Sequence, residues 1–175
     1  MKKILIVVDM QNDFIDGSLG TKEAKNIVPN VIEKIKQYEK EEASIFYTKD
    51  THFDNYLDTQ EGKKLPVEHC IKGTNGWMIP NNILRDHQGY VIEKYTFGSK
   101  DLFDYLYKEY SNEQFTSIEL IGLCTDICVI SNALLAKAYF PNINIIVDSA
   151  CCAGVTIESH QKALDTMKMC QITIL

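Results

Sequence analysis

Short apolar runs recur along the chain, and longer segments with helical spacing of apolar residues lie between them. The run at residues 4–8, ILIVV, is β-branched and uninterrupted, which is typical of a strand buried on both faces of a sheet. Comparable runs predict further strands at residues 44–48, 90–93, 117–123, 143–147 and 171–175.

Helical periodicity fills most of the intervening segments. Apolar residues at positions 27, 28, 31, 32 and 35 share one face of a predicted helix, with charged residues on the other side. Similar spacing predicts helices near residues 102–110, 129–139 and 156–167, the last beginning at a threonine that can cap its first turn. Because strands and helices alternate, we expect an α/β fold, a three-layer αβα sandwich with a mostly parallel, about six-stranded sheet.

Residues 50–89 do not follow this alternation. The segment is polar, contains several glycines and prolines, and has little periodicity. Loops of this length inside a compact domain are usually functional. With no repeat or linker elsewhere, we predict a single domain over residues 1–175 with a long functional loop at 50–89.

Composition and charge narrow the class of protein. The 175 residues are 45% hydrophobic and 24% charged, close to the average of globular proteins. A formal net charge of −6 without a basic run argues against binding to nucleic acid or to an anionic membrane. No apolar stretch approaches the roughly 20 residues of a membrane span. The N-terminal segment lacks a signal-peptide cleavage pattern, so we expect a cytoplasmic protein.

Reactive side chains follow the predicted strands at their carboxyl ends. The ends of the first five strands carry Asp9, then Asp50 and His52, then Lys94, then the turn 124–128 with Cys128, and then the segment 148–152. Ligands of an open parallel sheet bind beyond the carboxyl ends of its strands. We therefore expect an acid, an acid with a histidine, an amine and a thiol to converge in one crevice.

The thiol of Cys128 is the candidate nucleophile of this group. A thiol attacks as its thiolate, and a position at the start of a helix beside the Lys94 ammonium would lower its pKa. Asp9 could accept the proton. The backbone N–H groups of Cys124 and Cys128 could form an oxyanion hole. Together these groups predict nucleophilic acyl transfer.

Three segments resemble the signatures of the isochorismatase-like cysteine hydrolases, of which nicotinamidases are the best-known members. They are DMQNDF from Asp9, the pair Glu93–Lys94, and GLCTDICV around Cys128, in the family's order. The resemblance covers nearly the whole chain, from residue 3 to about 169. It implies the isochorismatase-like hydrolase fold, a catalytic triad of Asp9, Lys94 and Cys128, a cis peptide between Leu123 and Cys124, and no organic cofactor.

The resemblance also implies a metal site, because nicotinamidases bind a metal through an Asp-x-His pair and a later histidine. Asp50, His52 and His69 match three of these positions. Glu61 is the preferred fourth ligand and Glu68 the alternative. Two histidines with carboxylates suit Zn²⁺, Fe²⁺ or Mn²⁺, and the sequence does not choose among these ions or decide whether one is bound.

A small, flat amide such as nicotinamide is the predicted substrate, cleaved through a thioester. Phe14 matches the family position that packs against the substrate's flat face, and Trp77, Tyr95 and Phe97 are further pocket candidates. The alternatives are hydrolysis of another carbamoyl or ureido compound, and a non-enzymatic redox-sensing thiol module. The resemblance also implies a homo-oligomer, a dimer or a tetramer.

The sequence suggests no catalytic role for three further polar residues. Asp126 is expected to cap the following helix, and Thr125 to have a similar structural role. His160 has no evident partner and is predicted to lie at the surface.

Overall fold

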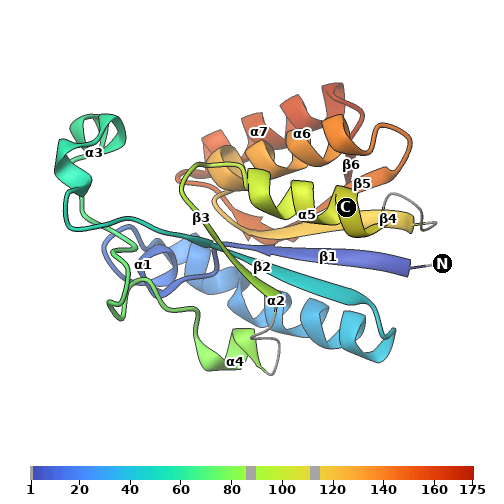
Figure 1. The fold of residues 1–175 in the computed structure, drawn as a ribbon, viewed down its shortest axis with the longest axis horizontal. Helices are drawn as coiled ribbons and strands as arrows, with labels where there is room; N and C mark the ends of the chain where they lie inside the picture. Colours follow the sequence, from blue (N-terminus) through green and yellow to red (C-terminus); the bar gives the residue numbers. More distant parts are fainter. Residues whose placement is uncertain (1, 86–89, 111–114) are drawn as a thin grey trace.

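A sheet of parallel strands forms the centre of the protein, as the computed structural model shows for residues 2–85, 90–110 and 115–175 (Figure 1). Six strands pair side by side in the order β3-β2-β1-β4-β5-β6, and every pairing is parallel. Their bounds are β1 (Lys2–Val8), β2 (Ser44–Asp50), β3 (Val91–Lys94), β4 (Phe115–Leu123), β5 (Asn144–Ala153) and β6 (Thr173–Ile174).

Helices cover both faces of this sheet, so the predicted three-layer αβα sandwich is confirmed. One apolar core lies under α5 (Lys100–Tyr110), α6 (Ile130–Tyr139) and α7 (Ile157–Met169). The other lies under α1 (Asn12–Ile15), α2 (Lys22–Lys40) and α4 (Asn81–Leu84). Successive residues of β1 alternate between the two cores, as the period of a strand requires, because Ile4 and Ile6 face the first and Leu5 the second.

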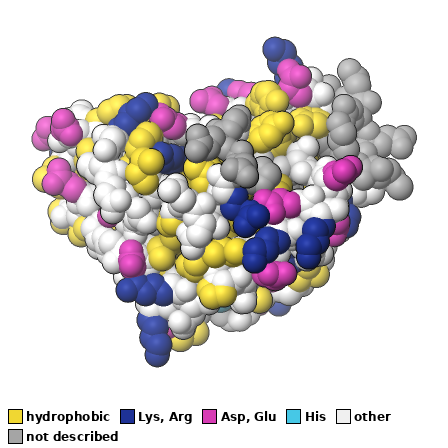
Figure 2. Space-filling model, turned by 90° about the horizontal axis from the view of Figure 1, so that it is seen from below, with side chains coloured by type: hydrophobic (Ala, Val, Ile, Leu, Met, Phe, Trp, Pro, Cys, Tyr) yellow, Lys and Arg dark blue, Asp and Glu magenta, His cyan; other side chains and the backbone are white. Residues whose placement is uncertain are grey.

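The longest helix, α2, shows how the sequence pattern becomes structure. Thr21 caps its N-terminus by accepting a hydrogen bond from the Ala24 N–H. Its apolar face is buried against the sheet, and each fully buried residue such as Val31 or Ile35 contributes roughly 1.5–3 kcal/mol. Charged side chains of both signs are scattered over the side of the molecule that α2 and α4 cover (Figure 2).

The segment 50–89 contains more regular structure than its sequence predicted. Asp50 is the last residue of β2, and the chain then forms η1 (Tyr56–Asp58), α3 (Gln60–Lys64) and α4. Figure 1 shows α3 set apart from the main body, at the end of a long excursion between β2 and β3. The last four residues of the predicted loop, 86–89, lie outside the described residues.

The fifth strand is also longer than predicted. β5 continues to Ala153, so Asp148 lies inside the strand and not beyond its end. Its carboxylate faces Lys34 of α2. Asp148 therefore takes no part in the crevice for which its predicted position made it a candidate.

The strand order reverses between β1 and β4, which are neighbours in the sheet. From β1 the chain proceeds outward through β2 and β3, and from β4 it proceeds the other way through β5 and β6. Gly122 pairs with Val8 at this point with φ +118°, and a Cβ there would lie 2.1 Å from the Val8 carbonyl oxygen. Only glycine allows this approach. The carboxyl ends of β1 and β4 thus flank the position where open α/β sheets bind ligands.

Among the helices of the described ranges, none has both the length and the apolar composition to cross a membrane.

Candidate active site

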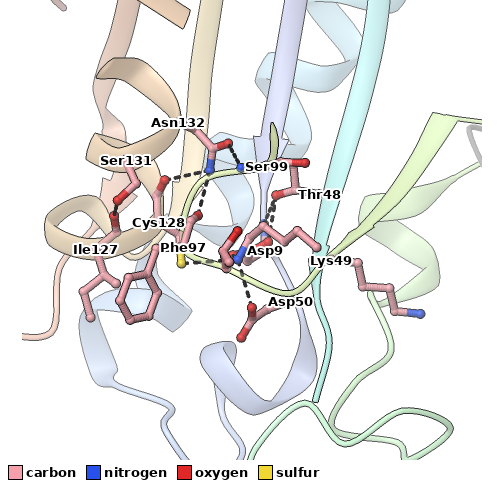
Figure 3. A network of polar contacts seen from close by, with 12 residues as sticks. Asp9, Thr48, Lys49, Asp50, Phe97, Ser99, Ile127, Cys128, Ser131 and Asn132 are labelled. Carbon is pink, nitrogen blue, oxygen red and sulfur yellow. Dashed lines mark hydrogen bonds and ion pairs between the residues drawn. The ribbon is translucent and has the colours of Figure 1, made fainter. Parts of the chain in front are cut away.

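The side chains of Asp9, Asp50 and Cys128 converge at the carboxyl ends of the strands (Figure 3). Lys94, the last residue of β3, contacts all three. Its Nζ lies 2.7 Å from Asp9 Oδ2, 2.9 Å from Asp50 Oδ1 and 3.5 Å from Cys128 Sγ. Asp9 is 0% exposed, Lys94 3% and Cys128 5%. The structure therefore brings together the three side chains that the sequence grouped, and it adds Asp50, which the sequence had assigned to the metal.

Asp9 is held by the strand beside it. It follows β1 with φ +46°, a left-handed conformation that is strained for a residue with a side chain. The Thr48 hydroxyl donates a 2.7 Å hydrogen bond to Asp9 Oδ1, while Oδ2 contacts Lys94. Both carboxylate oxygens are thus fixed, and the carboxylate cannot rotate away from the lysine and the thiol.

Burial dominates the protonation states of this cluster. It raises the pKa of Cys128 well above its ordinary value; the Lys94 charge opposes this only in part, because the charges of Asp9 and Asp50 add to the rise. Burial also raises the pKa of Asp9. Burial alone would lower the pKa of Lys94, but Asp9, Cys128 and Asp50 raise it well above its ordinary value. The expected lowering of the thiol pKa is therefore wrong, since the sequence did not reveal how deeply the thiol is buried and assigned Asp50 to the metal alone.

The turn that carries Cys128 joins β4 to α6. The Leu123–Cys124 peptide bond is cis. Residues Thr125–Val129 form η3, a single π-helical turn, in which the Cys124 carbonyl accepts hydrogen bonds from the N–H groups of Ile127 and Val129. Cys128 itself lies in the first turn of a helical segment that continues into α6.

Asn132 is a positioning residue that sequence reasoning missed. Its Nδ2 donates to the carbonyl oxygens of Cys128 at 2.8 Å and Phe97 at 3.2 Å, and its Oδ1 accepts the Ser99 N–H at 2.9 Å (Figure 3). The side chain is fully buried. It links the turn that carries Cys128 to the loop after β3. An amide one helical turn after Cys128, within an apolar and Ala-rich helix, was the available signal.

The residues of the predicted metal site also cluster. The ligand atoms of Asp50, His52 and His69 all lie within 4.8 Å of one another. Glu61 Oε1 lies 3.8 Å from His52 Nε2 and 3.9 Å from His69 Nε2, whereas Glu68 is exposed and is not in this group. The donors are two imidazoles and two carboxylates, a set that suits a divalent transition metal.

Hydrogen bonds around this cluster orient its donors. His69 Nδ1 lies 2.8 Å from the Val67 carbonyl oxygen and can donate to it, which directs Nε2 toward Asp50 and Glu61. Burial would raise the pKa of Asp50, but hydrogen bonds and charge from His52 and Lys94 lower it to about 2. Burial would likewise lower the pKa of His52, but Asp50 and Glu61 raise it. Asp50 is therefore ionised at neutral pH and contacts both Lys94 and the histidines.

A cavity of about 610 Å³ opens over both clusters. Cys128, Cys124, Asp50, His69 and Glu61 contribute to its wall. The apolar part of the wall includes three of the four predicted pocket aromatics, Phe14, Tyr95 and Phe97. Phe14 is buried, whereas Tyr95 and Phe97 are exposed at the surface.

Trp77, the fourth pocket candidate, lies outside this wall. Its ring packs against Lys49, whose Nζ is 3.0 Å from the ring centroid, and its Nε1–H donates to Thr51 Oγ1 at 2.9 Å. The attraction between the ammonium and the indole face accounts for this orientation.

Comparison with known proteins agrees with this geometry. Residues 3–175 match the family described as the isochorismatase domain. A nicotinamidase from Schizosaccharomyces pombe is 24% identical to the chain, with 98% of the chain and 91% of the relative covered. A protein from Arabidopsis thaliana named as a probable inactive nicotinamidase is 28% identical, with 94% and 87% covered.

A solved structure extends the comparison to the fold and the metal. The crystal structure of a pyrazinamidase from Pyrococcus horikoshii in complex with zinc superposes with a TM-score of 0.82. The two sequences are 26% identical, and the match covers 100% of this chain and 99% of that one.

Proposed function

The chain belongs to the isochorismatase family, and on that premise we propose that it is a cysteine-dependent amidohydrolase that cleaves the C–N bond of a small, nicotinamide-like amide. The observation that carries this proposal is the contact of Lys94 with both Asp9 and Cys128, of which Cys128 lies on the wall of the cavity. The names of the relatives, nicotinamidase and pyrazinamidase, support a flat aromatic amide as substrate. Because one relative is named inactive, family membership alone is a weaker argument than the contact.

In the first half of the proposed reaction, the Cys128 thiol becomes the nucleophile. The raised pKa of the thiol means that its proton leaves as the attack proceeds, and Asp9 accepts it. The sulfur bonds to the amide carbon, and the backbone N–H groups of Cys124 and Cys128 hold the oxyanion that forms. Lys94 stays charged and balances the negative charge that passes between the sulfur and Asp9.

The second half releases nitrogen and restores the thiol. Asp9 returns the proton to the amide nitrogen, the C–N bond breaks, and ammonia leaves a thioester on Cys128. Asp9 then takes a proton from a water molecule, whose oxygen attacks the thioester carbon. The C–S bond breaks, the carboxylic acid product leaves, and the sulfur regains its proton. The raised pKa of Asp9 makes the carboxylate a better base for both transfers.

The cluster of Asp50, His52, His69 and Glu61 fits a divalent ion in its donor set and in the orientation of His69. When bound, such an ion supplies a Lewis acid that can hold a ring nitrogen of the substrate or a water molecule. Asp50 serves both clusters, since Oδ1 stays on Lys94 while Oδ2 faces the histidines.

Ammonia release from a panel of small amides tests the proposal. The panel contains nicotinamide, pyrazinamide and a ureido compound, each with and without a chelator. We expect turnover of the aromatic amides by the native protein and none by Cys128→Ala. Cys170→Ala is the matched control, because Cys170 is exposed and is not part of the cavity wall, and it should keep full activity.

Three outcomes would contradict the proposal. Turnover that persists in Cys128→Ala would exclude the thiol as nucleophile. Turnover of the ureido compound alone would move the substrate class to carbamoyl compounds, and a native protein inactive on the whole panel would remove the amidase assignment.

A further inference from the structure

A hydrogen bond ties the turn that carries Cys128 to helix α7. Thr125 Oγ1 and His160 Nδ1 lie 2.8 Å apart. Thr125 is 0% exposed, and the His160 side chain is half-buried on the first turns of α7. The prediction that His160 is a surface residue without a partner is therefore wrong, because the sequence does not reveal where α7 docks.

A second hydrogen bond joins the turn to the chain that leads into α7. The Asp126 carboxylate accepts the Val155 N–H at 3.1 Å, so the turn is bonded to the chain just before α7. Gly154 lets this same stretch of chain pack closely on α7, since a Cβ there would lie 2.9 Å from the backbone N and Cα of His160. Gly154 and Val155 line the cavity, so this docking lies at its edge.

Thr125 occupies a sensitive place in the turn. It directly follows Cys124, and both it and Cys128 belong to η3. The backbone N–H groups of Cys124 and Cys128 are those proposed above to hold the oxyanion. A rotation of the Thr125 backbone would redirect the Cys124 end of this pair, and small errors in donor placement reduce turnover strongly.

The protonation state of His160 is compatible with its hydrogen bond to Thr125 at neutral pH. Burial lowers the pKa of its imidazole, with the Asp126 charge opposing in part. A neutral ring at neutral pH can accept the Thr125 hydroxyl proton at Nδ1. Without this partner, the buried Thr125 hydroxyl would be left without a hydrogen bond, which is unfavourable. The hydrogen bond therefore stabilises the packing of the turn against α7.

We propose that His160, through Thr125, is a positioning residue that fixes the oxyanion-binding N–H groups of the turn that carries Cys128. The inference rests on the proposed amidase function. It assigns His160 no contact with the substrate, because its side chain is not among the described residues that line the cavity. Its effect is on the barrier to the tetrahedral intermediate and not on substrate binding.

Amide turnover by paired variants is the first part of the test. Thr125→Val removes the hydroxyl at constant volume, and His160→Leu removes the ring nitrogen. We expect each to lower kcat by about 10- to 100-fold with KM changed by less than about threefold. His160→Asn places a polar atom near the position of Nδ1 and should recover most of kcat. The double variant should be no worse than the more impaired single variant, because both remove the same bond.

Alkylation of Cys128 by iodoacetamide, followed by mass spectrometry of the peptide that contains it, is the second part. Alkylation displaces iodide from a saturated carbon and forms no oxyanion. We therefore expect the variants to alkylate at the native rate although their amide turnover falls. Ser159→Ala is the matched control, since it weakens the capping box of α7 beside His160 and should lower the melting temperature without lowering kcat.

The outcomes separate the inference from the proposed function. Native kcat in Thr125→Val, or a parallel fall in alkylation and turnover, would overturn the positioning role and leave the amidase standing. Should the His160 variants fail to fold, Thr125→Val alone decides, as it leaves α7 unchanged. A native protein that releases no ammonia would overturn both claims.

Discussion

Two lysines in the described part of the chain each lie between two carboxylates with a cysteine nearby, but only the cluster around Lys94 reaches the cavity wall, through Asp50 and Cys128. Lys94 lies between Asp9 and Asp50, next to Cys128. Lys34 of α2 lies 2.8 Å from both Glu119 Oε1 and Asp148 Oδ2. The thiol of Cys151 donates to Asp148 Oδ2 at 3.6 Å.

Access distinguishes the two clusters more than composition does. The Lys34 cluster is closed by Tyr38, whose hydroxyl donates a 2.6 Å hydrogen bond to Glu119 Oε2. None of its members is among the described residues of the cavity wall. Burial raises the pKa of Cys151 to about 12, and burial also raises that of Cys128. A carboxylate, an amine and a thiol together therefore do not define a site until a substrate can reach them.

Replacing each lysine with methionine should give the largest difference in amide turnover between the two clusters. Lys94→Met removes the charge that balances Asp9 and the sulfur, and we expect kcat/KM for amide turnover to fall by at least about 10³-fold. Lys34→Met should leave kcat/KM within about threefold of native, since its partners touch neither cavity nor substrate. Lys94→Met leaves two buried carboxylates without their cation, so urea unfolding should report a loss of roughly 3–5 kcal/mol. Lys34→Met should lose less, because Asp148 is only partly buried. Equal losses of activity in the two variants would contradict the distinction.

Removing a hydroxyl group that donates a hydrogen bond to a carboxylate of each cluster should give a smaller difference in activity. Tyr38→Phe removes the hydrogen bond to Glu119, and Thr48→Val removes the one to Asp9. A hydrogen bond to a charged group contributes about 1.5–3 kcal/mol, so both variants should be less stable by a similar amount in urea unfolding. Only Thr48→Val should also lower kcat, by about 10-fold, because it frees the proposed base. A fall in kcat for Tyr38→Phe would show that the closed cluster acts on the cavity.

The sequence located the open cluster and overlooked the closed one for a physical reason. Asp9, Lys94 and Cys128 follow strands, and the rule that parallel strands converge at their carboxyl ends groups them without any knowledge of side-chain packing. Lys34 and Glu119 lie in the middle of a helix and a strand. Their meeting depends on the angle and register at which α2 packs on the sheet, which local periodicity does not give.

The same limit applies to the residues around Cys128. His160 and Asn132 act through partners on other elements, at Thr125 and at the loop after β3. Trp77 was assigned to the pocket from its place in the chain, and its packing against Lys49 depends on tertiary contacts. The fold class and the cluster membership at strand ends were accessible from the sequence; the contacts between helices and loops were not.

The pH dependence of stability should have opposite signs for one carboxylate from each cluster. Burial would raise the pKa of Asp148, but Lys34 lowers it below its ordinary value. Its ionised form therefore adds stability above the unfolded pKa near about 4, and this is lost as the pH falls through the lower folded value. Burial raises the pKa of Asp9, so the folded protein holds that proton longer, and its ionisation subtracts stability as the pH rises above about 4.

Asp148→Asn and Asp9→Asn should reveal these signs in urea unfolding measured at closely spaced pH values. Below about pH 4, Asp148→Asn should flatten the rise of unfolding free energy with pH, by at most about 1.4 kcal/mol per pH unit. Above about pH 4, Asp9→Asn should make the slope more positive, because it removes a group whose ionisation favours the unfolded chain. Both slopes are differences within one variant, so they are insensitive to the constant loss that each substitution causes. Slopes that change in the same direction would mean that Lys94 outweighs burial at Asp9, and the two lysine clusters would then be electrostatically alike and differ in access alone.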